Sequence, residues 1–221
     1  NTARQQRLKG EVRQLENFLL GITVFTDPAE TFYMVKLNRN RKFSYVFPTV
    51  VLFLFFCVRI MQIYCTHYPL ASVRSWEANI VVEIGKFVVP IVSWILGNYA
   101  VTSLLDGEAM ARELYLSTNL CLMPYIVFMP IIIGLSHFMS AEDAGVYNFL
   151  ITAVLVWVVV LLFLQTMHLN DYTLGKTVGV VFLSLIAIVI IWVIAILLFS
   201  LAKQFIDFIC GIYREFKINY L

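Results

Sequence analysis

The chain has 221 residues, of which 61% are hydrophobic and 14% charged, and its mean hydropathy is +0.84. These values lie outside the range of soluble globular proteins and are typical of a polytopic membrane protein. The net charge of +2 is too small for the basic surface on which nucleic-acid binding relies, so no nucleic-acid partner is expected.

The first 42 residues indicate amphipathic helices in the cytoplasm or at the membrane interface. One apolar face repeats at helical spacing among charged residues: Leu8, Val12, Leu15, Leu19 and Ile22. This helix either lies on the membrane interface or covers the bundle, or it is a docking helix or the end of an upstream domain. Thr26 or Asp27 can cap a second helix with Pro28 in its first turn. A basic collar is expected to end it: Lys36, Arg39, Arg41 and Lys42.

Five apolar runs follow, each close to the roughly 20 residues that cross a hydrocarbon core. They are predicted at residues 43–65, 79–105, 114–141, 146–167 and 177–202. The expected fold is an all-α membrane bundle of five transmembrane helices over residues 43–202, with an amphipathic extension at 203–221. Ten of fourteen basic residues in the flanks fall on one side, which predicts a cytoplasmic N-terminus and a multi-pass protein of the cytoplasmic membrane.

The third run contains Pro124 and Pro130, each of which removes a backbone hydrogen bond from a helix. In lipid such a helix persists only where neighbouring helices satisfy the freed groups. We therefore expect a broken helix that is packed inside the protein. The link before it, Asp106-Gly107-Glu108, is the most polar stretch between two spans.

Three charged residues interrupt the first two spans: Arg59, Glu83 and Lys86. Arg59 and Glu83 lie at similar depths under the same surface, since each is about six residues from the end of its span. Charges inside a membrane mark either a structural pair, with long side chains that reach water, or a path for a solute or proton. The sequence leaves both readings open.

Partner-binding candidates lie in two polar loops predicted to share the cytoplasmic face: Asp106, Glu108, Arg112, His168, Asp171 and Lys176. The loops are either solvated connectors, with a turn at Asn170 and Asp171, or they meet. If Lys176 or His168 contacts Asp106 or Glu108, the loops form a polar patch for a partner.

No catalytic, cofactor-binding or metal-binding residues are predicted. Asp106-Gly107 followed by Ala111-Arg112 is only a little like the metal-binding motif of membrane CDP-alcohol phosphotransferases, because the spacing differs and the later aspartates are missing. Three isolated histidines and four scattered cysteines suggest neither a catalytic group nor a metal site, and the cysteines are expected to be buried thiols. No nucleotide-binding loop of the Walker type is present.

The chain resembles the Yip (Ypt-interacting protein) domain family, and its bacterial members in particular. The resemblance combines the five-span layout with four short motifs: Asp27-Pro28 with Phe32-Tyr33 and Lys36, Leu105-Asp106-Gly107-Glu108, Leu122-Met123-Pro124-Tyr125, and Tyr172-Thr173-Leu174-Gly175-Lys176-Thr177. The motif of eukaryotic relatives that recruit Rab-type GTPases is absent.

The resemblance implies a non-enzymatic protein that acts through other membrane proteins or lipids, or as a homo-oligomer. The leading hypothesis is an accessory or scaffolding subunit of a bacterial membrane complex, with an ABC-type carbohydrate importer and its permeases as the expected host. The alternative is a channel or transporter with a polar path at Arg59, Glu83 and Lys86. A phosphotransferase-like enzyme is a remote third hypothesis.

Overall fold

The computed structural model describes residues 21–37, 46–67, 70 and 79–219, with no side-chain account beyond residue 210. The predicted helix through Leu19 and the collar residues Arg39, Arg41 and Lys42 lie outside the described residues. In the described part of the chain the regular structure is entirely helical, which confirms the all-α prediction. The helices are α2 (Pro28–Leu37), α3 (Val46–Cys65), α4 (Ile80–Leu104), α5 (Ala111–Cys121), α6 (Met123–Ser136), the short 3-10 helix η2 (Ala141–Asp143), α7 (Ala144–Leu169) and α8 (Leu174–Asn219).

Five helical segments among the described residues are long and apolar enough to cross a membrane, as predicted. They are Val46–Cys65, Val82–Leu104, Ala111–Ser136, Ala141–Leu169 and Leu174–Cys210. The chain is thus a multi-pass membrane protein by the length and composition of its helices. The fifth segment outruns its predicted end because α8 continues as one helix through the charged residues after Ala202.

The third span is broken, as its prolines predict. α5 ends at Cys121 and α6 begins at Met123, with Pro124 in the first turn of α6. The backbone N–H groups of a first turn have no partner within the helix, so the N–H that proline lacks costs α6 no hydrogen bond. Pro130 lies inside α6 without ending it. In the apolar stretch of this span 56% of the residues are buried, whereas the share is 28% or less in the other four spans. Neighbouring helices therefore surround the break.

The helix before the spans begins where the sequence predicts. Asp27 Oδ1 accepts a hydrogen bond from the Glu30 backbone N–H at 3.0 Å, which satisfies one of the open donors at the start of α2. Phe32 and Val35 are buried in a cluster shared with α5 and α7. This packing holds α2 against one end of the bundle.

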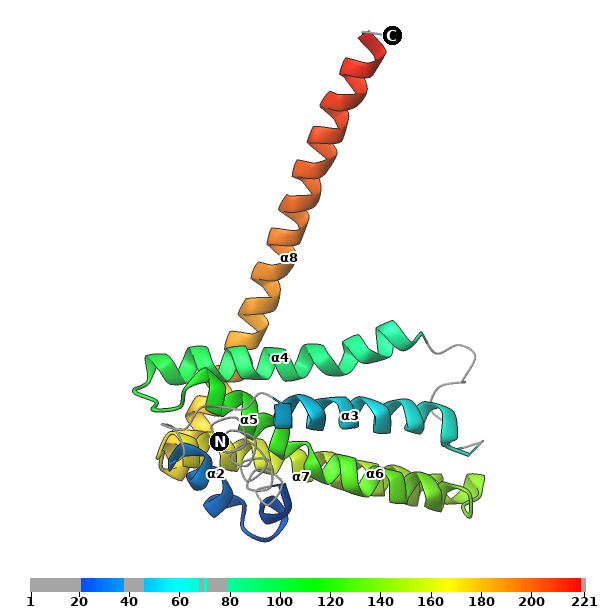
Figure 1. Cartoon of the computed structure of the whole chain (residues 1–221), viewed down its shortest axis with the longest axis vertical. Helices are drawn as coiled ribbons and strands as arrows, with labels where there is room; N and C mark the ends of the chain where they lie inside the picture. Colours follow the sequence, from blue (N-terminus) through cyan, green and yellow to red (C-terminus); the bar gives the residue numbers. More distant parts are fainter. Residues whose placement is uncertain (1–20, 38–45, 68–69, 71–78, 220–221) are drawn as a thin grey trace, which may run out of the picture.

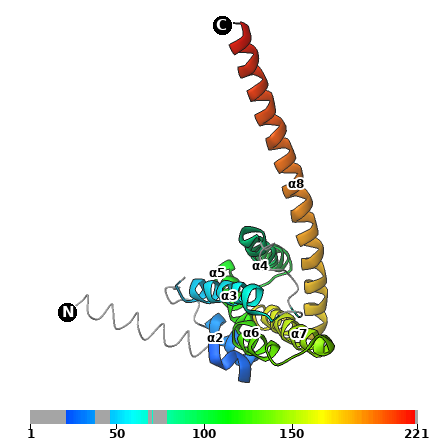
Figure 2. The same cartoon turned by 90° about the vertical axis from the view of Figure 1, so that its right-hand side faces the viewer.

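Helices α3, α4, α6 and α7 run side by side, and α8 crosses them (Figures 1 and 2). At 1.5 Å per residue the 46 residues of α8 extend about 69 Å. Its first third packs on α4 and α7, and every side chain from Trp192 to Cys210 is exposed. The distal part of α8 therefore projects from the bundle as an isolated apolar helix (Figure 1).

The seam between α4 and α8 is held by small residues and one hydrogen bond. A Cβ on Gly97 would lie 2.5 Å from Ile188 Cγ1 and 3.1 Å from the Ser184 carbonyl oxygen, so the two helices approach closely at this point. Trp192 Nε1 donates to Ser93 Oγ at 3.1 Å, about one helical turn along. Close approach through small residues is a usual way for helices to pack in lipid.

Replacing Gly97 by Ala is expected to loosen this seam. The added methyl group overlaps Ile188, and we expect the melting temperature in detergent to fall by a few degrees, as overpacking costs about 1–3 kcal/mol. Gly179→Ala in α8 is the matched control, because a Cβ there meets nothing within 4 Å and gives the same gain in helix propensity. Equal melting shifts in the two variants would contradict the close-packed seam.

Candidate interaction site

Three segments far apart in the sequence meet at one end of the bundle around Lys36 on α2. Its Nζ lies 2.8 Å from Glu108 Oε2 in the link between α4 and α5, and it also donates to Asp171 Oδ2 in the loop between α7 and α8. The Lys36 side chain is 14% exposed, whereas those of Glu108 and Asp171 are 57% and 60% exposed. The ammonium therefore lies beneath two carboxylates that face outward, and Lys36, Glu108 and Asp171 together form what we call the Lys36 patch.

The backbone of the link is packed tightly against α7. Asn170 Oδ1 accepts the Ala109 N–H at 3.1 Å, and Gly107 N–H donates to the Thr102 carbonyl at 2.8 Å. A Cβ on Gly107 would stand 2.6 Å from Asn170 Oδ1 and 2.7 Å from the Thr102 oxygen. Only glycine fits this contact without a shift of the link or of Asn170.

The turn at the start of the link and the turn between α7 and α8 share one backbone feature. Asp106 and Asp171 are the described non-glycine residues with positive φ, at 56° and 51°, a conformation that aspartate tolerates better than most residues. The predicted turn at Asn170 and Asp171 is thus present. Each turn bends the chain sharply at the end of a long helix.

Tyr172 joins the two loops. Its hydroxyl donates to the Leu105 carbonyl at 3.0 Å, and the Lys176 ammonium lies 4.2 Å from the centre of its ring. Burial, with the nearby Asp106 charge, raises the pKa of the Tyr172 phenol above its ordinary 10.0, so the hydroxyl remains a donor to a higher pH than that of an exposed tyrosine.

The two carboxylates that contact Lys36 keep its ammonium group protonated. Burial by itself would lower the pKa of the ammonium, but hydrogen bonds and charge from Asp171 and Glu108 outweigh burial and raise it above the ordinary 10.5. A folded-state pKa above the unfolded value contributes stability at any pH below 10.5, and this contribution is lost as pH rises through the folded pKa. On the lysine side the pairing therefore persists throughout the physiological range.

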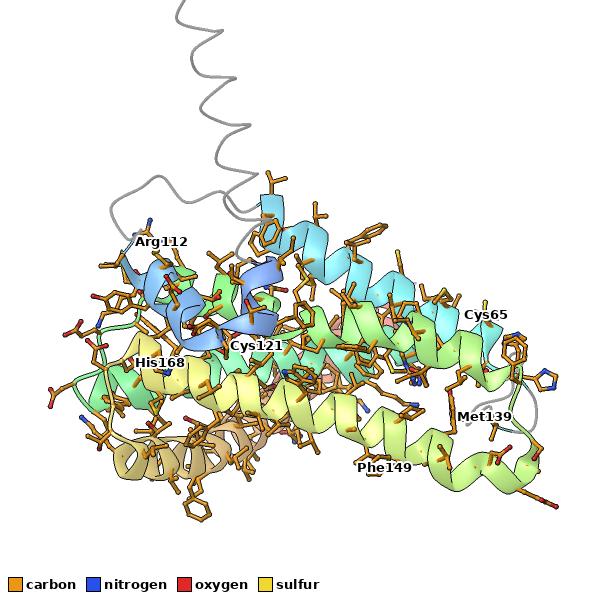
Figure 3. All side chains as sticks on the ribbon, turned by 90° about the horizontal axis from the view of Figure 1, so that it is seen from below. Cys65, Arg112, Cys121, Met139, Phe149 and His168 are labelled. Carbon is orange, nitrogen blue, oxygen red and sulfur yellow. The ribbon has the colours of Figure 1, made fainter. Side chains whose placement is uncertain are left out.

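The six predicted partner-binding residues gather at this end, but not in the predicted pairs. Lys36, rather than Lys176 or His168, reaches Glu108, while Lys176 stacks on Tyr172. Figure 3 shows Arg112 and His168 at the same end of the bundle, opposite Cys65 and Met139. Arg112 is exposed and contacts Met110 Sδ, and His168 is half-buried in the last turn of α7. Each lies near the patch without an ion pair to Asp106 or Glu108 in the described part of the chain.

The second charged cluster lies between α3 and α4, where a structural pair was one of the two alternatives that the sequence left open. Arg59 Nη2 is 2.8 Å from Glu83 Oε2, and Lys86 Nζ is 2.6 Å from Glu83 Oε1. Gln62 Oε1 accepts from Arg59 Nη1 at 2.6 Å and from the Tyr125 hydroxyl at 2.8 Å, so the cluster also reaches α6. A pocket of about 10 Å³ beside it has the size of one water molecule.

A layer of buried amide and hydroxyl side chains, missed by sequence reasoning, holds these elements together. Gln165 Nε2 on α7 lies 2.9 Å from both Ser117 Oγ and Thr118 Oγ1 on α5. Next to it, Asn98 Nδ2 on α4 donates to Thr166 Oγ1 at 2.9 Å. A glutamine inside an otherwise apolar run is the signal that could have indicated this layer.

The cysteine prediction was wrong for three of the four residues. Cys121 is buried, and three are exposed on apolar helices: Cys57, Cys65 and Cys210. These helix faces are lipid-facing in a membrane, so a buried position in the protein is not needed to shelter a thiol from water. Among the described residues no group of three or more His, Cys, Asp or Glu side chains could hold a metal ion.

Replacing Lys36 by Met is expected to destabilise the site, because two carboxylates then face each other without their shared cation. We expect a loss of about 1 kcal/mol, since both acceptors are largely exposed, and a melting shift of roughly 2–4 °C. Since the pKa of Lys36 is raised above 10.5, the contribution of its charge is fully present near neutral pH and is lost as pH rises through the folded-state pKa. Lys203→Met, at an exposed position of α8, is the control, and an equal shift in that variant would contradict the assignment.

No family model matches the chain, and no curated protein and no solved structure matches it. The resemblance to the Yip family rests on the sequence motifs and stays a prediction. What the site can do has to be inferred from its own residues.

Proposed function

We propose that this chain is a non-enzymatic integral membrane protein that acts as an accessory or scaffolding subunit of a complex in the cytoplasmic membrane. The observation that carries the proposal is the presentation of Glu108 and Asp171, which Lys36 fixes from below while more than half of each side chain faces outward. Fixed, exposed carboxylates favour a partner with basic groups because little side-chain freedom is lost on binding.

The composition of the patch supports a binding role over a catalytic one. Its charged groups are two carboxylates and one ammonium, and the Lys36 ammonium stays protonated near neutral pH. A general acid or base needs a pKa near the working pH, and an ammonium held above 10.5 does not meet that need. The patch is therefore suited to recognising charge.

The rigid backing of the patch also supports docking. The link is tied to α7 through Asn170 and Gly107, and α7 is tied to α5 through Gln165. A surface held on packed helices keeps its shape when a partner binds, which favours specific recognition. This backing extends from the patch into the most buried span.

The decisive test of the proposal is recovery of a partner from native membranes. Wild-type protein extracted in mild detergent is expected to pass through size exclusion with a stoichiometric partner, identified by mass spectrometry; permeases of an ABC-type carbohydrate importer are the partner expected from the sequence. The double variant Glu108→Lys/Asp171→Lys should lose at least about 90% of that partner, since reversed charges repel basic groups.

Glu142→Lys serves as the control, because this carboxylate is exposed in η2, just before α7, and lies outside the patch. It is expected to retain the partner. Recovery of the chain alone, or only as a homo-oligomer, overturns the proposal. Equal loss of partner in the control and in the double variant, with all proteins folded, assigns the contact to another surface.

A channel or transporter is the second candidate, and one observation favours it. Arg59, Glu83 and Lys86 form a charged cluster inside two spans, with the Glu83 side chain only 6% exposed. Charged groups at such positions often serve a solute or proton path. Against this, the adjoining pocket holds about one water molecule, and the charges are mutually paired.

Flux measurements separate the two candidates. In sealed vesicles that contain the purified chain, the scaffold proposal expects no flux of protons or Na⁺ above that of empty vesicles. The transporter candidate expects flux that Glu83→Gln abolishes and Glu142→Gln preserves, with partner recovery unchanged. Flux with that response to Glu83 would replace the scaffold proposal.

A further inference from the structure

Two histidines from different helices meet at the end of the bundle opposite the Lys36 patch. His67 follows the C-terminus of α3 and His137 follows that of α6, and their ring centres are 5.6 Å apart with planes inclined by 39°. Both side chains are exposed. The expectation of three isolated histidines is therefore wrong for this pair, because the two residues lie 70 positions apart and their spacing in the sequence gives no sign of the contact.

The backbone around the pair is held in place. The His67 backbone N–H donates to Ser136 Oγ at 3.2 Å, and Ser136 Oγ in turn donates to the Ile133 carbonyl at 2.6 Å. Ser136 is buried and directly precedes His137. This contact fixes the end of α3 to the end of α6, and it keeps the two imidazoles next to each other.

The His137 ring is oriented as it is in many metal sites. Its Nδ1 lies 3.1 Å from the Ile133 carbonyl oxygen, which only accepts hydrogen bonds, so Nδ1 carries the proton. In the neutral ring Nε2 then has a free lone pair. A backbone carbonyl that fixes the tautomer in this way is a common second contact of metal-binding histidines.

We propose that His67 and His137 form a two-histidine site for a divalent transition metal such as Zn²⁺, with water completing the coordination. Imidazole nitrogen bonds Zn²⁺ at about 2.0 Å, which places the ring centres of two ligands roughly 5–6 Å apart. The observed 5.6 Å lies in that range, and both rings are exposed, so that water can complete the coordination. Imidazole ligands favour zinc, copper and nickel over magnesium or calcium.

The site is distinct from the patch that carries the proposed function and does not depend on it. Because described residues supply two ligands, the expected affinity is modest and open coordination positions remain for water. The proposal therefore predicts exchangeable metal rather than a structural ion that the fold needs.

The test is titration of the full chain, purified without a histidine tag, with Zn²⁺ at neutral pH. We expect one Zn²⁺ per chain, with affinity lowered at least about tenfold by His67→Ala and by His137→Ala alike. His168→Ala is the matched control, since this third histidine lies at the opposite end of the bundle, and it should bind as wild type does (Figure 3). Mg²⁺ should not compete.

A second measurement on the wild-type chain needs no variant. Diethylpyrocarbonate modifies accessible imidazoles, and mass spectrometry of the peptides reports each histidine separately. Zn²⁺ is expected to protect His67 and His137 while leaving the modification of His168 unchanged. Absence of binding, equal protection of all three histidines, or affinity insensitive to His67 and His137 would overturn the proposal.

Discussion

The carboxamide of Gln165 is the contact on which the packing of the apolar helices depends. An amide buried among hydrocarbon without a partner costs several kcal/mol, so α7 can sit at this depth only where α5 offers hydrogen-bonding groups. Ser117 and Thr118 provide them, and they do so at one register of the two helices. Thr166 then meets Asn98 on α4, and Asn170 meets the link at Ala109. The register of α7 thereby sets the positions of α4, α5 and the Lys36 patch.

Features that depend on neighbouring residues could be predicted from the sequence. Apolar runs of sufficient length gave five spans, Pro124 gave the break between α5 and α6, and Asp27 gave the start of α2. The contact between Arg59 and Glu83 followed from equal depth under one surface, because a span converts sequence position into depth. These predictions use length, proline chemistry and helix caps, all of which act locally.

What the sequence patterns could not supply were contacts between distant segments. Lys36 lies 135 positions from Asp171, and nothing in the periodicity of α2 distinguishes it from the other basic residues near it. The direction in which α8 leaves the bundle could not be predicted either, because a uniformly apolar helix has no distinct face to indicate which neighbour it packs against. The close approach at Gly97 decides where α8 crosses α4, and one missing side chain is a weak signal in a sequence with ten glycines.

The distribution of burial within the described residues differs sharply between the spans. The broken span is 56% buried and the α8 span 11%, so packing is concentrated at the polar layer and falls away along the last helix. Within the layer, the Gln165 amide bonds to the hydroxyl groups of Ser117 and Thr118, so these three side chains are engaged with one another. The groups that face outward include the carboxylates above Lys36 and the apolar side chains of distal α8. Polar groups that pair inside the bundle and carboxylates that face outward are the arrangement that the proposed subunit role requires.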